Sequence, residues 1–150
     1  MSFLNRLKDM AQQSLKEGQD AFSRFNNQVF ADAAMAACAL IGAADGTIDQ
    51  QERSKTSSFI GSSDKLKAFD VTRLRSKYDE YCDKVTRDFD FGKIELMQVI
   101  GKLKKPEEKR AVVQLAMLIA GADGTFDEKE RLVVRDISNA LSLDPGEFGV

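Results

Sequence analysis

The chain has 150 residues, 43% of them hydrophobic, so it is long and apolar enough for one globular domain with a sizeable core. Its formal net charge of −2 argues against nucleic acid or a strongly anionic surface as its partner. It has only two cysteines and no apolar run long enough to cross a bilayer, so we expect a soluble protein of the reducing cytoplasm.

Residues 1–27 are predicted to contain an amphipathic helix. Apolar side chains recur at three- and four-residue spacing over residues 2–25. The basic side chains among them would also suit a helix on a membrane surface. Because Asp9, Glu17 and Asp20 nearly cancel those positive charges, we favour a helix that packs on the core or on a partner protein.

The rest of the chain is predicted to be helical as well. Residues 28–44 are apolar on nearly all sides, which is typical of a buried central helix. Further helical segments are expected at residues 49–61, 65–69, 70–88, 93–103, 107–122 and 127–141, with a last turn after Asp144. The phrase DFDFG is expected to end the helix of residues 70–88. No segment shows a strand pattern, so we predict one compact all-α domain of about seven helices over residues 1–150.

One short phrase occurs twice in the chain. Residues 40–53 read LIGAADGTIDQQER and residues 118–131 read LIAGADGTFDEKER, with nine of fourteen positions identical and no gap. Repetition of this kind indicates that one supersecondary unit was used twice. We therefore predict two helical hairpins, at residues 28–61 and 106–141, each with an acidic loop and related by a pseudo-two-fold axis.

The repeated phrase matches the second half of an EF-hand calcium loop. The first and third ligand positions would be Ile41 and Ala43, or Ile119 and Gly121, so neither loop is an ordinary EF-hand. If the two loops pair, their carboxylates would share one pocket or ridge and would favour a divalent cation or a basic partner. Oxygen ligands favour Ca²⁺ or Mg²⁺ over softer metals. The candidate ligands are Asp45, Asp49, Glu52, Asp123, Asp127 and Glu130.

Helix capping explains much of the same phrase without any ligand. Gly46 suits the left-handed backbone that closes a helix, and Asp49 with Glu52 would form an N-cap and a capping box. Capping does not need Asp45 or Asp123, and it would accept Ser or Thr where both copies have Asp. The sequence physics leaves both interpretations open.

No catalytic constellation is visible in the sequence. It has no histidine, no nucleophile paired with a base, and no phosphate-binding glycine pattern. Cys38 lies in the predicted buried helix, where a cysteine behaves as a small apolar residue. Cys82 lies among charged residues and is expected to be exposed, although the neighbouring acids would raise the pKa of its thiol.

Three features together resemble the TerB family of tellurite-resistance proteins: the doubled ADGT-[IF]-D-x-x-ER phrase, the run FADAAMAACALIGAADG and the ending LDPGEFGV. The resemblance extends over essentially the whole chain. It implies an all-helical domain with internal symmetry, and a part in tellurite resistance and related phage and colicin stress phenotypes. It also implies a metal site at the six carboxylates named above, and no catalytic residue. The implied partners are a TerC-type multi-pass membrane protein and calcium-binding TerD-type proteins at the inner face of the cytoplasmic membrane.

We therefore predict a non-enzymatic component of tellurite resistance that binds a divalent cation, protein partners, or both through its acidic loops. No organic cofactor or nucleic acid is expected, and contact with the membrane would be indirect. The alternative is an interaction scaffold whose loops dock a basic partner surface without metal. Loops that only cap helices, and a thiol enzyme that acts on tellurite, are two further alternatives.

Overall fold

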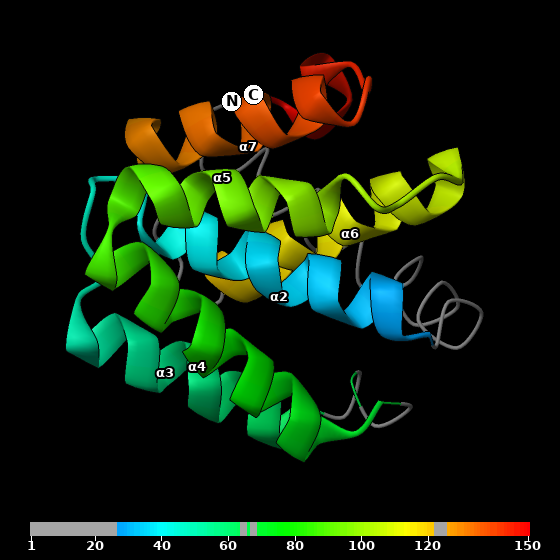
Figure 1. Cartoon of the computed structure of the whole chain (residues 1–150). Helices are drawn as coiled ribbons and strands as arrows, with labels where there is room; N and C mark the ends of the chain where they lie inside the picture. Colours follow the sequence, from blue (N-terminus) through cyan, green and yellow to red (C-terminus); the bar gives the residue numbers. More distant parts are fainter. Residues whose placement is uncertain (1–26, 64–65, 67–68, 122–125) are drawn as a thin grey trace.

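The computed structural model describes residues 27–63, 66, 69–121 and 126–150. These residues form six α-helices, one short 3₁₀-helix and no strand (Figure 1), which confirms the all-α prediction. The helices are α2 (Gln28–Gly42), α3 (Gln50–Ser62), α4 (Val71–Arg87), α5 (Phe89–Ile100), α6 (Pro106–Ala120) and α7 (Glu128–Ala140), followed by the 3₁₀-helix η2 (Pro145–Phe148). The expected total of about seven is one more than this, and the predicted helix over residues 2–25 lies outside the described residues. The predicted turn at residues 65–69 is described only in part.

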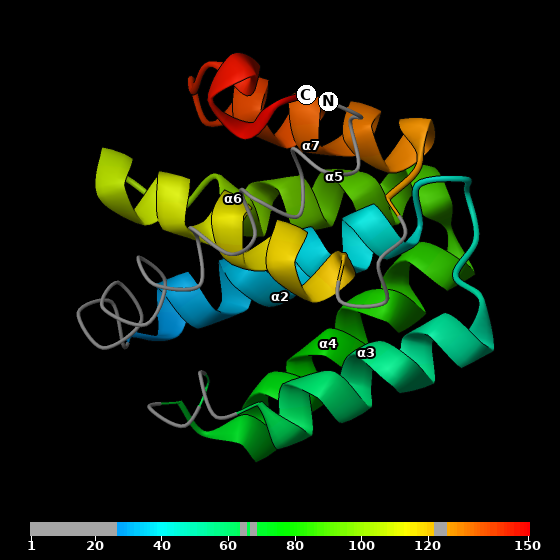
Figure 2. The same ribbon diagram turned by 180° about the vertical axis from the view of Figure 1, so that it is seen from behind.

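The centre of the fold is α2, which is surrounded by other helices (Figures 1 and 2). Asn27 begins α2 by accepting a hydrogen bond from the Phe30 amide at 2.9 Å. Every residue from Ala33 to Ile41 is buried, and six of these nine are alanine or cysteine. Small side chains let neighbouring backbones approach closely, so α4, α5 and α6 can all pack against this one helix.

The two repeated units pack against each other at the centre of the fold. α3 packs mainly on α4 and also touches α6, while α7 touches both α2 and α6. The second helix of each unit therefore contacts the first helix of the other unit. A pseudo-two-fold relation between the units predicts this reciprocal pattern.

The junction of α4 and α5 also differs from the prediction. The phrase DFDFG was expected to separate two helices, but Asp88 alone does so, with an extended backbone at φ −154°. Its side chain accepts a hydrogen bond from the Phe91 amide at 3.1 Å, so α5 begins at Phe89 rather than at Lys93. Gly92 lies inside α5 and is buried against the backbone of α4. The glycine thus serves close helix packing here rather than helix termination.

Among the described residues, no helix is both long and apolar enough to cross a membrane.

Candidate functional site

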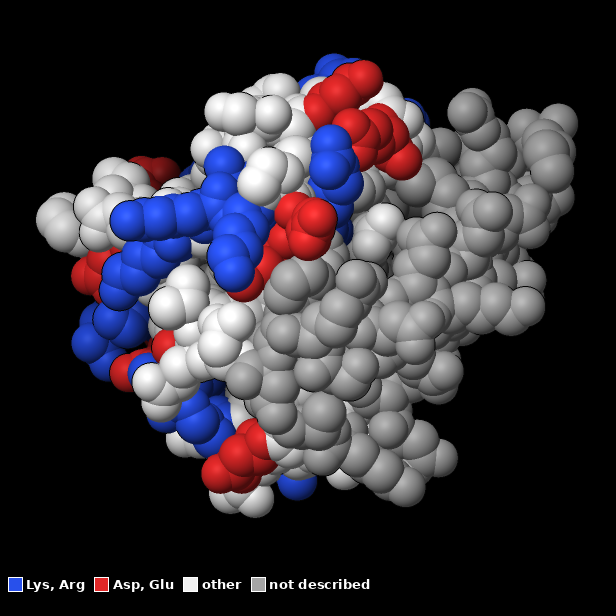
Figure 3. Space-filling view, turned by 90° about the vertical axis from the view of Figure 1, so that its right-hand side faces the viewer, with Lys and Arg blue, Asp and Glu red and all other residues white. Residues whose placement is uncertain are grey.

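Both acidic phrases follow helices that end on the same side of the molecule. α2 and α6 pack against each other and run in the same general direction (Figures 1 and 2). Because a helix C-terminus carries partial negative charge, these two ends add to the field of the acidic side chains. Lys and Arg side chains gather on the side where α2 and α6 begin (Figure 3), and Lys102, Lys104 and Lys105 are exposed in the turn between α5 and α6.

The first phrase forms a tight turn between α2 and α3. The Gly46 amide donates to the Ala43 carbonyl at 2.9 Å, and Gly46 has a φ of +96°, which favours glycine. The Asp45 carboxylate accepts from the Thr47 amide at 3.2 Å. Asp49 then begins α3 by accepting from the Gln51 amide at 2.7 Å. Both aspartates are exposed, and each uses an oxygen for local backbone structure.

The second phrase repeats the helix start. The Asp127 carboxylate accepts from the Glu130 amide at 2.8 Å, and the Asp127 amide donates to the Glu130 carboxylate at 3.2 Å. This reciprocal pair is a capping box at the start of α7. Asp123 lies outside the described residues. The capping interpretation is therefore confirmed for Asp49, Asp127 and Glu130.

The last acid of each phrase reaches one shared pocket, which we call the junction pocket. It has a volume of about 60 Å³, space for only a few water-sized groups. Its lining comes from both units and from α4: Cys38, Gly42, Ile48, Glu52, Lys55, Thr56, Phe59, Tyr78, Ile119, Ala120 and Glu130. Of the six predicted carboxylates, Glu52 and Glu130 line this pocket. Asp45, Asp49 and Asp127 are exposed and do not line it.

Three polar residues of the junction pocket were missed by sequence reasoning. Lys55 and Thr56 lie three and four residues after Glu52 in α3, so helical spacing alone could have placed them beside that acid. Tyr78 comes from α4, and no local pattern in the sequence signals its position. Burial and the neighbouring Cys82 raise the pKa of Tyr78 well above its usual range, so its hydroxyl stays protonated and can donate a hydrogen bond.

The described residues do not form a complete metal site by themselves. No group of three or more Asp, Glu, Cys or His side chains in the described ranges is close enough to hold an ion. Glu52 and Glu130 supply hard oxygen donors, which suit Ca²⁺ or Mg²⁺. An ion in the junction pocket would therefore need further oxygen ligands beside these two carboxylates.

The two cysteines are both free and buried, which corrects the expectation of an exposed Cys82. Burial raises the pKa of Cys38 well above its usual range, and the nearby Cys82 adds to this effect. Burial raises the pKa of Cys82 to about 11; Asp79 and Asp83 also raise it, while Tyr78 and Arg53 oppose the shift. Cys82 lies on the buried side of α4, so burial raises the pKa of its thiol more than the charges of the flanking residues do.

Both thiols are expected to be nearly inert in the folded protein. The thiolate is the reactive form, and a raised pKa lowers its fraction at every pH below the new value. Reaction with a chromogenic disulfide at pH 8 should be at least about a hundredfold slower than in denaturant, and should accelerate only toward pH 11. Rapid modification of native protein would contradict this assignment.

The fold and the junction pocket define an all-helical protein in which two related acidic units meet. The profile of the family described as "Tellurite resistance protein TerB" matches residues 31–149, so the chain belongs to the TerB family. It is 29% identical to the "Tellurium resistance protein TerB" of Alcaligenes sp over 119 residues, which cover 79% of this chain and 95% of that protein. Membership of the family suggests a role in tellurite resistance. No solved structure gives a significant match to the chain.

Proposed function

We propose that this protein acts in tellurite resistance as a non-enzymatic binding protein, and that the junction of its two acidic phrases is the binding site. The observation that carries this proposal is the position of Glu52 and Glu130. They are equivalent residues of the two copies, and they line the same pocket. Capping at the start of each helix does not require the two copies to meet.

The first candidate ligand is a divalent cation, with Ca²⁺ or Mg²⁺ favoured. Two carboxylates and the negative ends of α2 and α6 give the junction pocket a favourable potential for positive charge. Lys55 lines the same pocket and opposes this potential. With few protein ligands, the affinity would resemble that of the weakest calcium sites, with a Kd on the order of 10⁻³ M.

The second candidate ligand is a basic surface of a partner protein. Asp45, Asp49 and Asp127 belong to the two acidic phrases and are exposed, so their carboxylates can accept hydrogen bonds from Lys or Arg. The partners that the family resemblance implies are a TerC-type membrane protein and TerD-type proteins. In this proposal the protein works in the cytoplasm beside the inner membrane, contacts the lipid only through these partners, and uses neither nucleic acid nor an organic cofactor.

Titration with Ca²⁺, Mg²⁺, Mn²⁺ and Zn²⁺, followed by NMR, tests the cation proposal. Binding should shift the amide signals of Gly46 and Gly124, one in each phrase, with Ca²⁺ or Mg²⁺ giving the larger change. Amides in the turn between α5 and α6, at the other side of the molecule, should not move. Absence of any shift at millimolar concentrations would remove the cation site from the free protein.

A pull-down with the TerC-type membrane protein separates the two ligands. The variant Asp45→Asn/Asp123→Asn removes two charges and keeps side chains of nearly equal size. Loss of partner capture, with or without added cation, would support direct docking of a basic surface. Full capture and full resistance would show that the charges of Asp45 and Asp123 are not needed for partner binding or for resistance.

A further inference from the structure

A second binding feature lies away from the junction pocket, in the angle between α4 and α5. The two helices meet at Asp88 and diverge from there (Figures 1 and 2). A groove of about 650 Å³ occupies this angle. Its lining is Ser76, Asp79, Glu80, Asp83, Lys84, Arg87, Asp88, Phe91, Gly92 and Glu95. We call it the α4–α5 groove, and no role for it was predicted from the sequence.

The apolar part of this groove lies on the outer face of α5. Phe91 is 66% exposed and lines the groove, and Ile94, one turn later on the same helix, is 57% exposed. Single exposed apolar residues are common, but two large ones at helical spacing beside a groove form a small continuous patch. Leu96 and Ile100 of α5 face the core, so the helix has apolar side chains on two sides.

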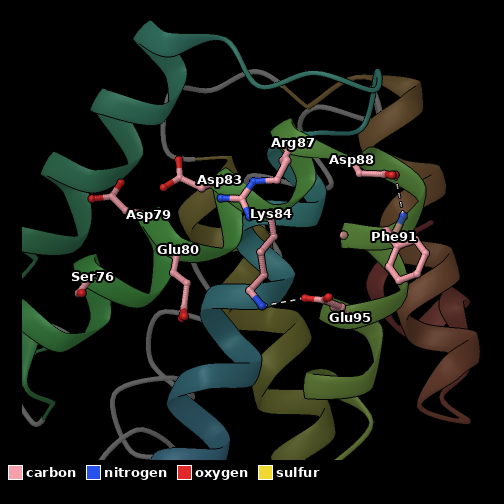
Figure 4. Close-up of a pocket in the computed structure, with 10 residues that line it drawn as sticks. Ser76, Asp79, Glu80, Asp83, Lys84, Arg87, Asp88, Phe91 and Glu95 are labelled. Atoms are coloured by element: carbon pink, nitrogen blue, oxygen red, sulfur yellow. Dashed lines mark hydrogen bonds and ion pairs between the residues drawn. The ribbon is translucent and has the colours of Figure 1, made fainter.

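The polar part of the groove is mainly acidic. Five of its lining residues are carboxylates and two are basic. Figure 4 shows Asp79, Glu80 and Asp83 projecting from α4, while Lys84 crosses to Glu95 of α5 at 2.7 Å. Lys77 of α4 also pairs with Glu80 at 3.2 Å. With Lys77 and Arg53 counted, five acids face four bases, so the groove keeps a net charge of −1. This remaining negative charge favours a cationic partner over nucleic acid or an anionic lipid surface.

Two of the carboxylates are held in place from the far side. Arg53 of α3 contacts Asp83 at 2.8 Å and Asp79 at 3.4 Å, and its side chain is only 17% exposed. The Asp79 and Asp83 side chains remain 52% and 60% exposed. Because a carboxylate has about four acceptor positions, each can still bind an incoming Lys or Arg. The groove is thus organised before any partner arrives, which lowers the entropy lost on binding.

We propose that the α4–α5 groove docks a basic amphipathic segment of a partner protein. Apolar side chains of that segment pack on Phe91 and Ile94, and its Lys or Arg side chains bind Asp79, Glu80 and Asp83. The proposal is independent of cation binding in the junction pocket, because Phe91, Ile94 and these carboxylates do not line that pocket.

Fluorescence polarisation with labelled synthetic peptides tests this proposal on the full-length protein. The probe is a peptide of Lys and Leu at helical spacing, and the comparison peptides replace Lys by Glu or Leu by Ser. The Lys/Leu peptide should bind, the Lys/Ser peptide should bind about tenfold more weakly, and the Glu/Leu peptide should not bind. Phe91→Ala should weaken the Lys/Leu peptide about tenfold. Glu80→Gln/Asp83→Asn should weaken it severalfold and reduce its dependence on salt.

Matched controls distinguish this groove from other sites. Leu132→Ala removes a 52% exposed apolar side chain of α7, outside the groove, and should leave peptide affinity unchanged. Asp45→Asn/Asp123→Asn should also leave it unchanged. Equal affinity of Phe91→Ala and wild type, or NMR shifts at the acidic phrases instead of α4 and α5, would overturn the proposal. A wild-type dimer in sedimentation that Phe91→Ala converts to monomer would assign the groove to a second copy of this chain instead.

Discussion

Replacement of Gly92 by alanine is expected to lower the free energy of unfolding by about 2 kcal/mol. A Cβ atom at this position would lie 2.8 Å from the Lys84 carbonyl oxygen and 2.8 Å from the Val85 Cα. Both are backbone atoms, so no side-chain rotation relieves the clash, and α4 and α5 must move apart. An exposed glycine in a helix behaves in the opposite way, because its replacement by alanine contributes about 1 kcal/mol of stability.

Gly42→Ala is the matched control for this prediction. Gly42 also lies in a helix, and the nearest atom to its added Cβ is the Tyr78 hydroxyl oxygen at 4.0 Å, an ordinary contact. Its stability should therefore be unchanged or slightly increased. Urea unfolding followed by circular dichroism measures both variants. If Gly92→Ala is as stable as wild type, the close approach of α4 and α5 is not needed for the fold.

Helix positions could be predicted well wherever local chemistry determines them. The caps Asp49, Asp70, Asp127 and Asp144 all accept backbone hydrogen bonds at helix starts. Pro106 begins α6 without a side-chain cap, as its fixed φ allows. These features act within four residues, so the sequence displays them directly.

Features that depend on distant contacts could not be predicted in the same way. Cys82 has charged neighbours in sequence, yet it is fully buried because it lies on the side of α4 that packs against α2. In the sequence, Gly92 resembles a residue that ends a helix. In the structure it lies inside α5, where the α4 backbone is too close for a Cβ atom. Similarly, Arg53 joins α3 to Asp79 and Asp83, more than twenty residues along the chain. Only the packing of α3 on α4 brings them together.

The candidate site was predicted in part. The repeated phrase indicated that two acidic units exist, and the structure places the last acid of each in one pocket. The sequence could not show that Asp45 and Asp49 would use carboxylate oxygens for backbone turns. Asp45 and Asp49 therefore stabilise local backbone structure, while Glu52 and Glu130 line the shared pocket. Glu52 and Glu130 are thus the better positions at which to test cation binding by mutation.

Glu52→Gln/Glu130→Gln is expected to weaken Ca²⁺ binding by about tenfold or more. The change removes two negative charges from the junction pocket and keeps side chains of nearly equal size. Glutamine also serves as the third residue of a capping box, so the start of α7 should stay intact. Isothermal titration calorimetry, or the NMR shift of Gly46 against Ca²⁺ concentration, measures the affinity. An unchanged urea midpoint would show that the fold is preserved.

A second substitution in the same pocket should act in the opposite direction. Lys55→Gln removes the positive charge that lines the pocket beside Glu52, so Ca²⁺ affinity should rise by about threefold. Glu128→Gln removes an exposed acid from the first turn of α7 that does not line the pocket, and should change affinity by less than about twofold. If Glu52→Gln/Glu130→Gln lowers Ca²⁺ affinity, Lys55→Gln raises it and Glu128→Gln leaves it nearly unchanged, the cation lies between the two units. Ca²⁺ affinity equal to wild type in Glu52→Gln/Glu130→Gln would place any cation elsewhere.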